Sequence, residues 1–309
     1  MTRILLIGRN GQVGFELANR LTGLGELVVT GRDQIDLARP SSIRSVMREI
    51  KPGLIINAAA YTAVDRAEAE PELAMAINGT APAVLAEEAK RLSAALIHYS
   101  TDYVFDGLKQ SAYVEDDPTC PLNSYGRSKL AGEQAIVASG IPHLIFRTSW
   151  VYGTRGANFM LTMLRLAGER ERIQVVNDQF GVPTSSPWLA QSTVDILGRL
   201  GAGPGRFADA IAGRGGIYHL VPCGSTTWYD FASSIMVNAS RMGGSVTRPH
   251  TRKAPILEPI RTEQYPVRTP RPKYSVLANG KAMLAFGLDM PPWQAVLDDC
   301  MSRPWSTFG

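Results

Sequence analysis

The stretch Arg3-Ile-Leu-Leu-Ile-Gly8-Arg-Asn-Gly11-Gln-Val-Gly14 decides the fold of this chain. Its first part is a short apolar run typical of a buried strand, and apolar residues at helical spacing follow from Gln12 to Leu24. Glycines at three-residue intervals let the backbone turn tightly and approach an anion, which the free N–H groups of the helix start can bind. The sequence therefore predicts a dinucleotide-binding loop made of Gly8, Asn10, Gly11, Gln12, Val13 and Gly14.

Strands and helices alternate after this first unit. Apolar strands that alternate with helices indicate βαβ units, whose parallel sheet is covered on both faces. The predicted fold is α/β, a doubly wound parallel sheet of the Rossmann type, with ligands bound at the carboxyl ends of its strands. We predict further strands at 27–30, 54–57, 95–100 and 144–148, and helices at 41–50 (with Ser41 or Ser42 as N-cap), 69–77, 80–93 and 124–139.

The alternation weakens after about residue 150, where glycine and proline punctuation increases. We predict a dinucleotide-binding domain over residues 1–150, with a return segment near 183–220. Residues 151–182 and 221–309 are predicted to form a smaller, mixed α/β domain that binds the substrate. Two stretches of the second half read as rich in loops, 199–216 and 243–275.

The composition is that of an ordinary globular protein, with 309 residues of which 45% are hydrophobic and 19% charged. No stretch has the roughly 18 apolar residues that a membrane span needs, and no signal peptide is expected. The net charge of +4 comes without a basic run, so nucleic acid is not an expected partner. Three distant cysteines and four histidines show no metal-ligand spacing, so we predict no metal site, free thiols and a reducing, cytoplasmic location.

Tyr125 and Lys129 form the motif Tyr-x-x-x-Lys within the predicted helix 124–139. Residues four apart share one face of a helix, so the lysine ammonium can lie near the phenol and lower its pKa. A phenol tuned in this way can donate a proton in catalysis. We therefore predict that Tyr125 is the proton donor and that Lys129 tunes it and binds the cofactor ribose.

The spacing of the glycine loop together with Tyr125 and Lys129 resembles the extended form of the short-chain dehydrogenase/reductase superfamily. This resemblance implies that Asp36 and Leu37 contact the adenine and that the strand end at Ala58, Ala59, Ala60 and Tyr61 forms a second cofactor loop. It also implies a hydroxyl at the end of the strand 95–100 that binds the substrate carbonyl. Thr101 fits that role best, and Ser100 is the alternative.

A closer resemblance, to the dTDP-4-dehydrorhamnose reductase family, extends over nearly the whole chain. It implies reduction of dTDP-4-dehydro-β-L-rhamnose to dTDP-β-L-rhamnose by NAD(P)H, a step in making activated rhamnose for bacterial polysaccharides. It also implies that Asp102, Trp150 and Arg271 contact the dTDP-sugar, since a guanidinium suits a diphosphate. The matching segments are 57–68, 98–107, 121–133, 147–153, 177–184, 218–220 and 270–275.

One family feature lacks support in this chain. Some members bridge two subunits through Mg²⁺, and Glu16 matches one of their acidic positions. The stretch Ser185–Gln191 offers no carboxylate, however, so a Mg²⁺-bridged dimer is disfavoured and Glu16 is expected to be a surface residue of a helix. A monomer and a homodimer both remain open.

The choice between NADPH and NADH depends on the end of the second strand, where the sequence is Thr30-Gly-Arg32-Asp33. An arginine there accommodates the 2′-phosphate of NADP, whereas a carboxylate binds the ribose 2′-hydroxyl of NAD. Arg32 and Arg9 together outweigh Asp33, so NADPH is predicted to be preferred, with NADH as the alternative. If Arg32 instead pairs with Asp33 across solvent, both cofactors should be used.

Two other functions compete with a reductase. One is a nucleotide-sugar 4-epimerase or 4,6-dehydratase of the same superfamily, although a dehydratase should carry an Asp-Glu pair where this chain has Asp102-Tyr103. The other is a non-catalytic, cofactor-binding regulatory subunit of the same fold. The complete set of Thr101, Tyr125 and Lys129 favours catalysis over that alternative.

Overall fold

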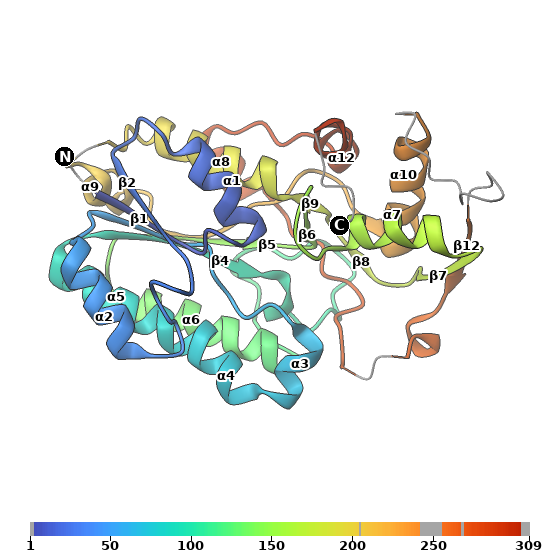
Figure 1. Cartoon of the computed structure of the whole chain (residues 1–309), viewed down its shortest axis with the longest axis horizontal. Coiled ribbons are helices and arrows are strands. Elements are labelled where there is room, and N and C mark those ends of the chain that lie inside the picture. Colours follow the sequence, from blue (N-terminus) through green and yellow to red (C-terminus); the bar gives the residue numbers. More distant parts are fainter. Residues whose placement is uncertain (1–2, 204, 242–254, 267–268, 304–309) are drawn as a thin grey trace.

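A parallel sheet of six strands forms the centre of the structure, a computed structural model that describes residues 3–203, 205–241, 255–266 and 269–303 (Figure 1). All neighbouring strands in it are parallel, and their order is β10-β5-β4-β3-β1-β2. This confirms the predicted doubly wound α/β fold. The strands are β1 (Arg3–Ile7), β2 (Glu26–Thr30), β3 (Leu54–Asn57), β4 (Ala95–Thr101), β5 (His143–Thr148) and β10 (Gly216–His219).

Helices cover both faces of this sheet because its apolar strands present buried side chains to either side. On one face Leu6 and Phe146 pack with α1 (Gln12–Arg20), α8 (Ser186–Arg199) and α9 (Phe207–Ala212). On the other face Leu5 and Ile145 pack with α2 (Pro40–Ile50), α5 (Ala81–Leu92) and α6 (Ser124–Ser139). Covering both faces leaves the strand ends as the place for a ligand.

Several predicted helix boundaries were wrong. The helix expected at Gln12–Leu24 ends at Arg20. The helix expected from residue 41 begins at Pro40 with Arg39 as its N-cap, and Ser42 instead accepts a hydrogen bond from the backbone N–H of Asp36 (3.0 Å). The helix expected at 69–77 is divided into α3 (Val64–Ala69), α4 (Pro71–Met75) and a π-helical turn, η1 (Ala76–Thr80). Pro71 separates α3 from α4 because it has no N–H with which to continue α3.

A second hydrophobic core lies beyond the sheet, on the right in Figure 1. It is built from α7 (Phe159–Glu169), α10 (Trp228–Arg241) and α12 (Trp293–Ser302), beside a parallel pair of strands, β7 (Arg172–Val176) and β12 (Ile256–Ile260). Residues 243–254 and 267–268 of the predicted loop stretch 243–275 lie outside the described residues. The domain boundaries given above stay a prediction. The short elements are β6 (Val151–Tyr152), β8 (Phe180–Gly181), β9 (Thr184–Ser185), β11 (Thr226–Thr227), η2 (Asp102–Val104), η3 (Thr262–Gln264) and α11 (Gly280–Phe286).

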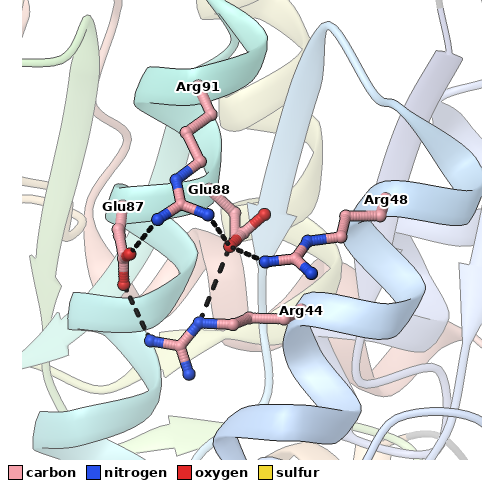
Figure 2. Close-up of polar contacts among 5 residues, drawn as sticks. All are labelled: Arg44, Arg48, Glu87, Glu88 and Arg91. Carbon is pink, nitrogen blue, oxygen red and sulfur yellow. Dashed lines mark hydrogen bonds and ion pairs between the residues drawn. The ribbon is translucent and has the colours of Figure 1, made fainter.

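An ionic cluster joins α2 to α5, as Figure 2 shows. Arg44 and Arg48 of α2 and Arg91 of α5 surround the carboxylate of Glu88 at 3.3–3.6 Å. Only 2% of the Glu88 side chain is exposed, so these arginines compensate a carboxylate that has lost its water. The cluster therefore holds the two helices in register on their face of the sheet.

The cysteines Cys120, Cys223 and Cys300 are unpaired, as expected. Among the described helices, none has the length and apolar character required to cross a bilayer.

Candidate active site

A cleft of about 800 Å³ opens at the carboxyl ends of β1, β3, β4 and β5. Parallel strands bring these ends to one edge of the sheet, so loops that are distant in sequence meet there. Thr101, Asp102 and Trp150 line the cleft beside the predicted cofactor residues. Of the latter, those in contact with the cleft are Gly8, Asn10, Gly11, Gln12, Val13, Arg32, Asp36, Leu37, Ala58, Ala59, Ala60, Tyr61, Tyr125 and Lys129.

The glycine loop forms a cradle of bare backbone. Gly8 has a φ of +104°, and a Cβ there would lie 2.8 Å from the backbone nitrogen of Ala59. Gly14 does not line the cleft; a Cβ on it would lie 2.0 Å from the carbonyl oxygen of Gly8, so it lets α1 pack against the loop. A cradle without side chains in front of a helix start fits the pyrophosphate of a dinucleotide.

The charged side chains near the end of β2 do not form the pair between Arg32 and Asp33 that would imply use of both cofactors. Asp33 binds the guanidinium of Arg9 (3.0 Å), whose other nitrogen donates to Gln34 (3.3 Å). Arg32 therefore keeps its charge at the cleft wall without the Asp33 partner that would weaken its role. Asp36 lines the cleft, and its carboxylate accepts from the backbone N–H of Ala38 (3.0 Å).

Tyr125 and Lys129 both face the cleft, but the electrostatic relation predicted between them is absent. Burial raises the pKa of Tyr125 to about 12, and the Thr101 hydroxyl only opposes that rise. Lys129 donates instead to the Tyr99 carbonyl (2.6 Å) and meets His98 Nε2 at 3.2 Å. The expected lowering of the tyrosine pKa by lysine was wrong for the cofactor-free protein, because burial raises this pKa and Lys129 makes its hydrogen bonds with His98 and Tyr99. Tyr125 consequently keeps its proton across the physiological range.

Thr101 and Asp102 form a polar corner beside Tyr125. The Thr101 hydroxyl donates to Asp102 Oδ1 (3.0 Å), and the other carboxylate oxygen is buried without a hydrogen-bond partner. Burial raises the pKa of Asp102 to about 6. The hydroxyls of Ser100 and Thr148, which also line the cleft, are buried and unpartnered as well. Buried polar atoms without partners at a cleft wall are suited to binding a polar ligand.

An aromatic stack forms another part of the cleft wall. The rings of Trp150 and Trp228 are parallel with centroids 3.6 Å apart, and Phe159 packs on Trp228. Trp150 has a φ of +47°, and a Cβ on Gly181 would lie 2.4 Å from its ring, so glycine is required beneath it. The sequence analysis singled out Trp150 but not Trp228, which is the first residue of α10.

Arg271 is the one predicted substrate residue that does not line the cleft. Its guanidinium binds Asp65 of α3 (3.0 Å), while its Nε is buried without a hydrogen-bond partner. The side chain is 25% exposed. Arg271 therefore lies beside α3, in the segment that follows η3, and its unpaired Nε–H is left as a donor for a ligand.

Glu16 was expected at the surface, but it is buried and only 7% exposed. Arg20, one turn further along α1, binds its carboxylate. Within the described residues, no three His, Cys, Asp or Glu side chains come together as metal ligands.

This chain is similar to known proteins over nearly its full length. A family model described as the RmlD substrate binding domain matches residues 1–304. The dTDP-4-dehydrorhamnose reductase of Burkholderia thailandensis is 44% identical over 97% of this chain and 98% of the relative. That of Escherichia coli K12 is 42% identical over 98% of both. The structure of the Bacillus anthracis dTDP-4-dehydrorhamnose reductase in complex with NADP matches with a TM-score of 0.85 and 33% identity, over 98% of this chain and 99% of that one.

Fold, cleft and these matches define a class, the Rossmann-type oxidoreductases of the short-chain dehydrogenase/reductase kind. Within that class, the chain belongs to the dTDP-4-dehydrorhamnose reductase family.

Proposed function

We propose that this protein reduces the C4 ketone of dTDP-4-dehydro-β-L-rhamnose to give dTDP-β-L-rhamnose. The bound nicotinamide cofactor supplies the hydride. Tyr125 donates its proton to the ketone oxygen, and the Thr101 hydroxyl holds that oxygen as it gains charge. Lys129 binds the cofactor ribose, and Asp102 and Trp150 position the sugar. The observation that carries the proposal is the placement of Tyr125 with Thr101 in a cleft whose glycine cradle fits a dinucleotide.

Turnover of dTDP-4-dehydrorhamnose tests this proposal against its two rivals. A reductase oxidises one NADPH for each keto-sugar consumed and then exchanges the cofactor. An epimerase or dehydratase keeps its cofactor through the cycle, and a regulatory subunit binds cofactor without turnover. Absorbance of the reduced cofactor should therefore fall in proportion to added keto-sugar, and no net oxidation would contradict the proposal. The unpaired cysteines favour a reducing compartment, the cytoplasm, for this reaction.

NADPH is the cofactor that the charges at the end of β2 favour. Arg9 neutralises Asp33, the carboxylate that would otherwise select the ribose hydroxyl of NAD. Arg32 remains at the cleft wall as the cation for a 2′-phosphate. We therefore assign the preference for NADPH over NADH to two residues. Arg32 contacts the 2′-phosphate directly, and Arg9 neutralises Asp33 in an ion pair.

Replacing either arginine should move the cofactor preference. Arg32→Ala is expected to lower the kcat/KM ratio of NADPH over NADH by about tenfold, since one charged hydrogen bond contributes about 1.5–3 kcal/mol. Arg9→Ala should lower the same ratio by releasing Asp33. Arg165→Ala is the matched control, because Arg165 is 46% exposed, pairs with Glu169 and does not line the cleft. A wild type that prefers NADH, or an Arg32→Ala ratio that equals the wild type's, would show that Arg32 is not the selector.

Arg271→Ala is expected to raise the KM for the dTDP-sugar about tenfold or more while the cofactor Kd stays the same. The reason is the loss of a guanidinium that pairs with anionic oxygen atoms. Asp65→Asn is the control, since it removes the protein's own partner of Arg271 and leaves the guanidinium free for substrate. Steady-state kinetics with varied sugar concentration measure both variants. An unchanged KM in Arg271→Ala would reduce its role to the ion pair with Asp65.

A further inference from the structure

A row of buried polar side chains runs behind the wall of the cleft, from β3 through β4 to α6. Asn57 and His98 are paired in register on β3 and β4, and Asn57 Nδ2 lies 3.2 Å from His98 Nδ1. The opposite ring nitrogen, Nε2, lies 3.2 Å from Lys129 Nζ. All three residues are at most 2% exposed, so their polar atoms depend on protein partners for their hydrogen bonds.

The direction of these hydrogen bonds follows from the backbone. Asn57 Oδ1 accepts from the N–H of Ala59 (3.3 Å), which turns the amide N–H₂ of Asn57 toward His98. His98 Nδ1 must therefore accept. A neutral imidazole carries a single N–H, so this hydrogen is on Nε2 and points at Lys129.

For His98 to donate this hydrogen to Lys129, the lysine nitrogen must carry a lone pair. An ammonium has three donors and no lone pair, whereas a neutral amine has one. The amine can accept from His98 and still donate to the Tyr99 carbonyl at 2.6 Å. An ammonium would need the other histidine tautomer, and its Nδ1–H would then meet the N–H₂ of Asn57. Turning that amide over would set its N–H₂ against the N–H of Ala59.

Burial also favours the uncharged amine. It lowers the pKa of Lys129 to about 8, so the amine is the main form above about pH 8, and it holds the pKa of His98 well below its usual range. Glu133, one turn further along α6, raises the pKa of Lys129, but this carboxylate is itself bound by Arg147 of β5. The other titratable groups around this point are Tyr125 on α6, Tyr99 on β4 and Asp102 on η2.

We propose that His98 is a positioning residue that stabilises the uncharged form of Lys129 in the cofactor-free protein and thereby lowers the pH below which Lys129 becomes a cation. Neither His98 nor Asn57 lines the cleft, so both act through Lys129. The consequence for catalysis rests on the proposed function, since Lys129 is the residue assigned to the cofactor ribose. The state of Lys129 itself does not depend on that function.

The test is the titration of Lys129 in the cofactor-free protein by NMR, with ¹³C at lysine Cε. The chain has seven lysines, and the signal lost in Lys129→Arg identifies the one of interest. In His98→Gln the amide oxygen can take the place of Nε2 and accept from an ammonium, which favours the charged form. The Lys129 midpoint should therefore rise by about one pH unit or more. His143→Gln is the control, because His143 lies at the start of β5 and binds the Ile141 carbonyl (2.8 Å).

A midpoint in His98→Gln equal to that of the wild type would overturn the proposal. Should that variant not fold, ¹⁵N NMR of the wild-type histidines above the Lys129 midpoint decides the matter, since the proposal requires the hydrogen on Nε2 of His98 there and a hydrogen on Nδ1 contradicts it. The pH profile of kcat/KM should move with the NMR midpoint. If NADPH oxidation fails while the tautomer and midpoint are as expected, the proposed function is wrong and the link between His98 and Lys129 stands.

Discussion

Tyr125→Phe is expected to lower kcat by about 10²–10⁴-fold, which is the usual contribution of a positioned proton donor. The phenyl ring keeps the packing of the tyrosine, including its edge contact with Tyr103 at 5.5 Å, but it has no proton to give. Cofactor Kd, measured by fluorescence titration, should therefore stay the same while turnover is lost.

Tyr103→Phe is the matched control for that variant. Tyr103 is a neighbouring tyrosine that also lines the cleft, and burial raises its pKa too. It lies on η2, whereas Tyr125 and Lys129 lie on α6. Its kcat should fall far less than that of Tyr125→Phe. Comparable losses in the two variants, or near-normal turnover in Tyr125→Phe, would remove Tyr125 from the role of proton donor.

Arg147→Met is expected to lower the free energy of unfolding by about 3–5 kcal/mol, because it leaves the buried carboxylate of Glu133 without a counter-charge. The two side chains are 3% and 1% exposed, and two guanidinium nitrogens bind the carboxylate at 2.7–3.2 Å. Arg147 also donates to the Glu115 carbonyl (3.2 Å). Urea denaturation of wild type and variant measures the difference.

The exposed pair Arg165–Glu169 is a control with the same 2.7 Å distance but about half of each side chain in solvent. Arg165→Met should cost at most about 1 kcal/mol, because water already solvates both charges. The double variant Arg147→Met/Glu133→Met should recover much of the stability, since an apolar pair leaves no unpaired charge. Equal losses in Arg147→Met and Arg165→Met would show that burial does not govern this pair.

The main sheet and the helix that carries Tyr125 were predictable because both depend on local pattern. Apolar runs such as Leu54–Asn57 form strands wherever helices cover both faces, and α6 was predicted with its observed ends. Gly140 stops α6 in a left-handed conformation that favours glycine. The boundaries between 64 and 80 were less predictable, since alanine-rich sequence there is compatible with helix throughout and only Pro71 divides it.

The sequence by itself determined the parallel sheet, the glycine cradle and the shared face of Tyr125 and Lys129, because spacing along the chain dictates each of them. Tertiary structure alone decided which charges pair. Asp33 binds Arg9 instead of Arg32, Arg271 binds Asp65 from 206 positions away, and Lys129 meets His98 instead of Tyr125. A side chain chooses among partners by distance and by loss of water in the folded state, and neither quantity exists until the strands and helices have packed.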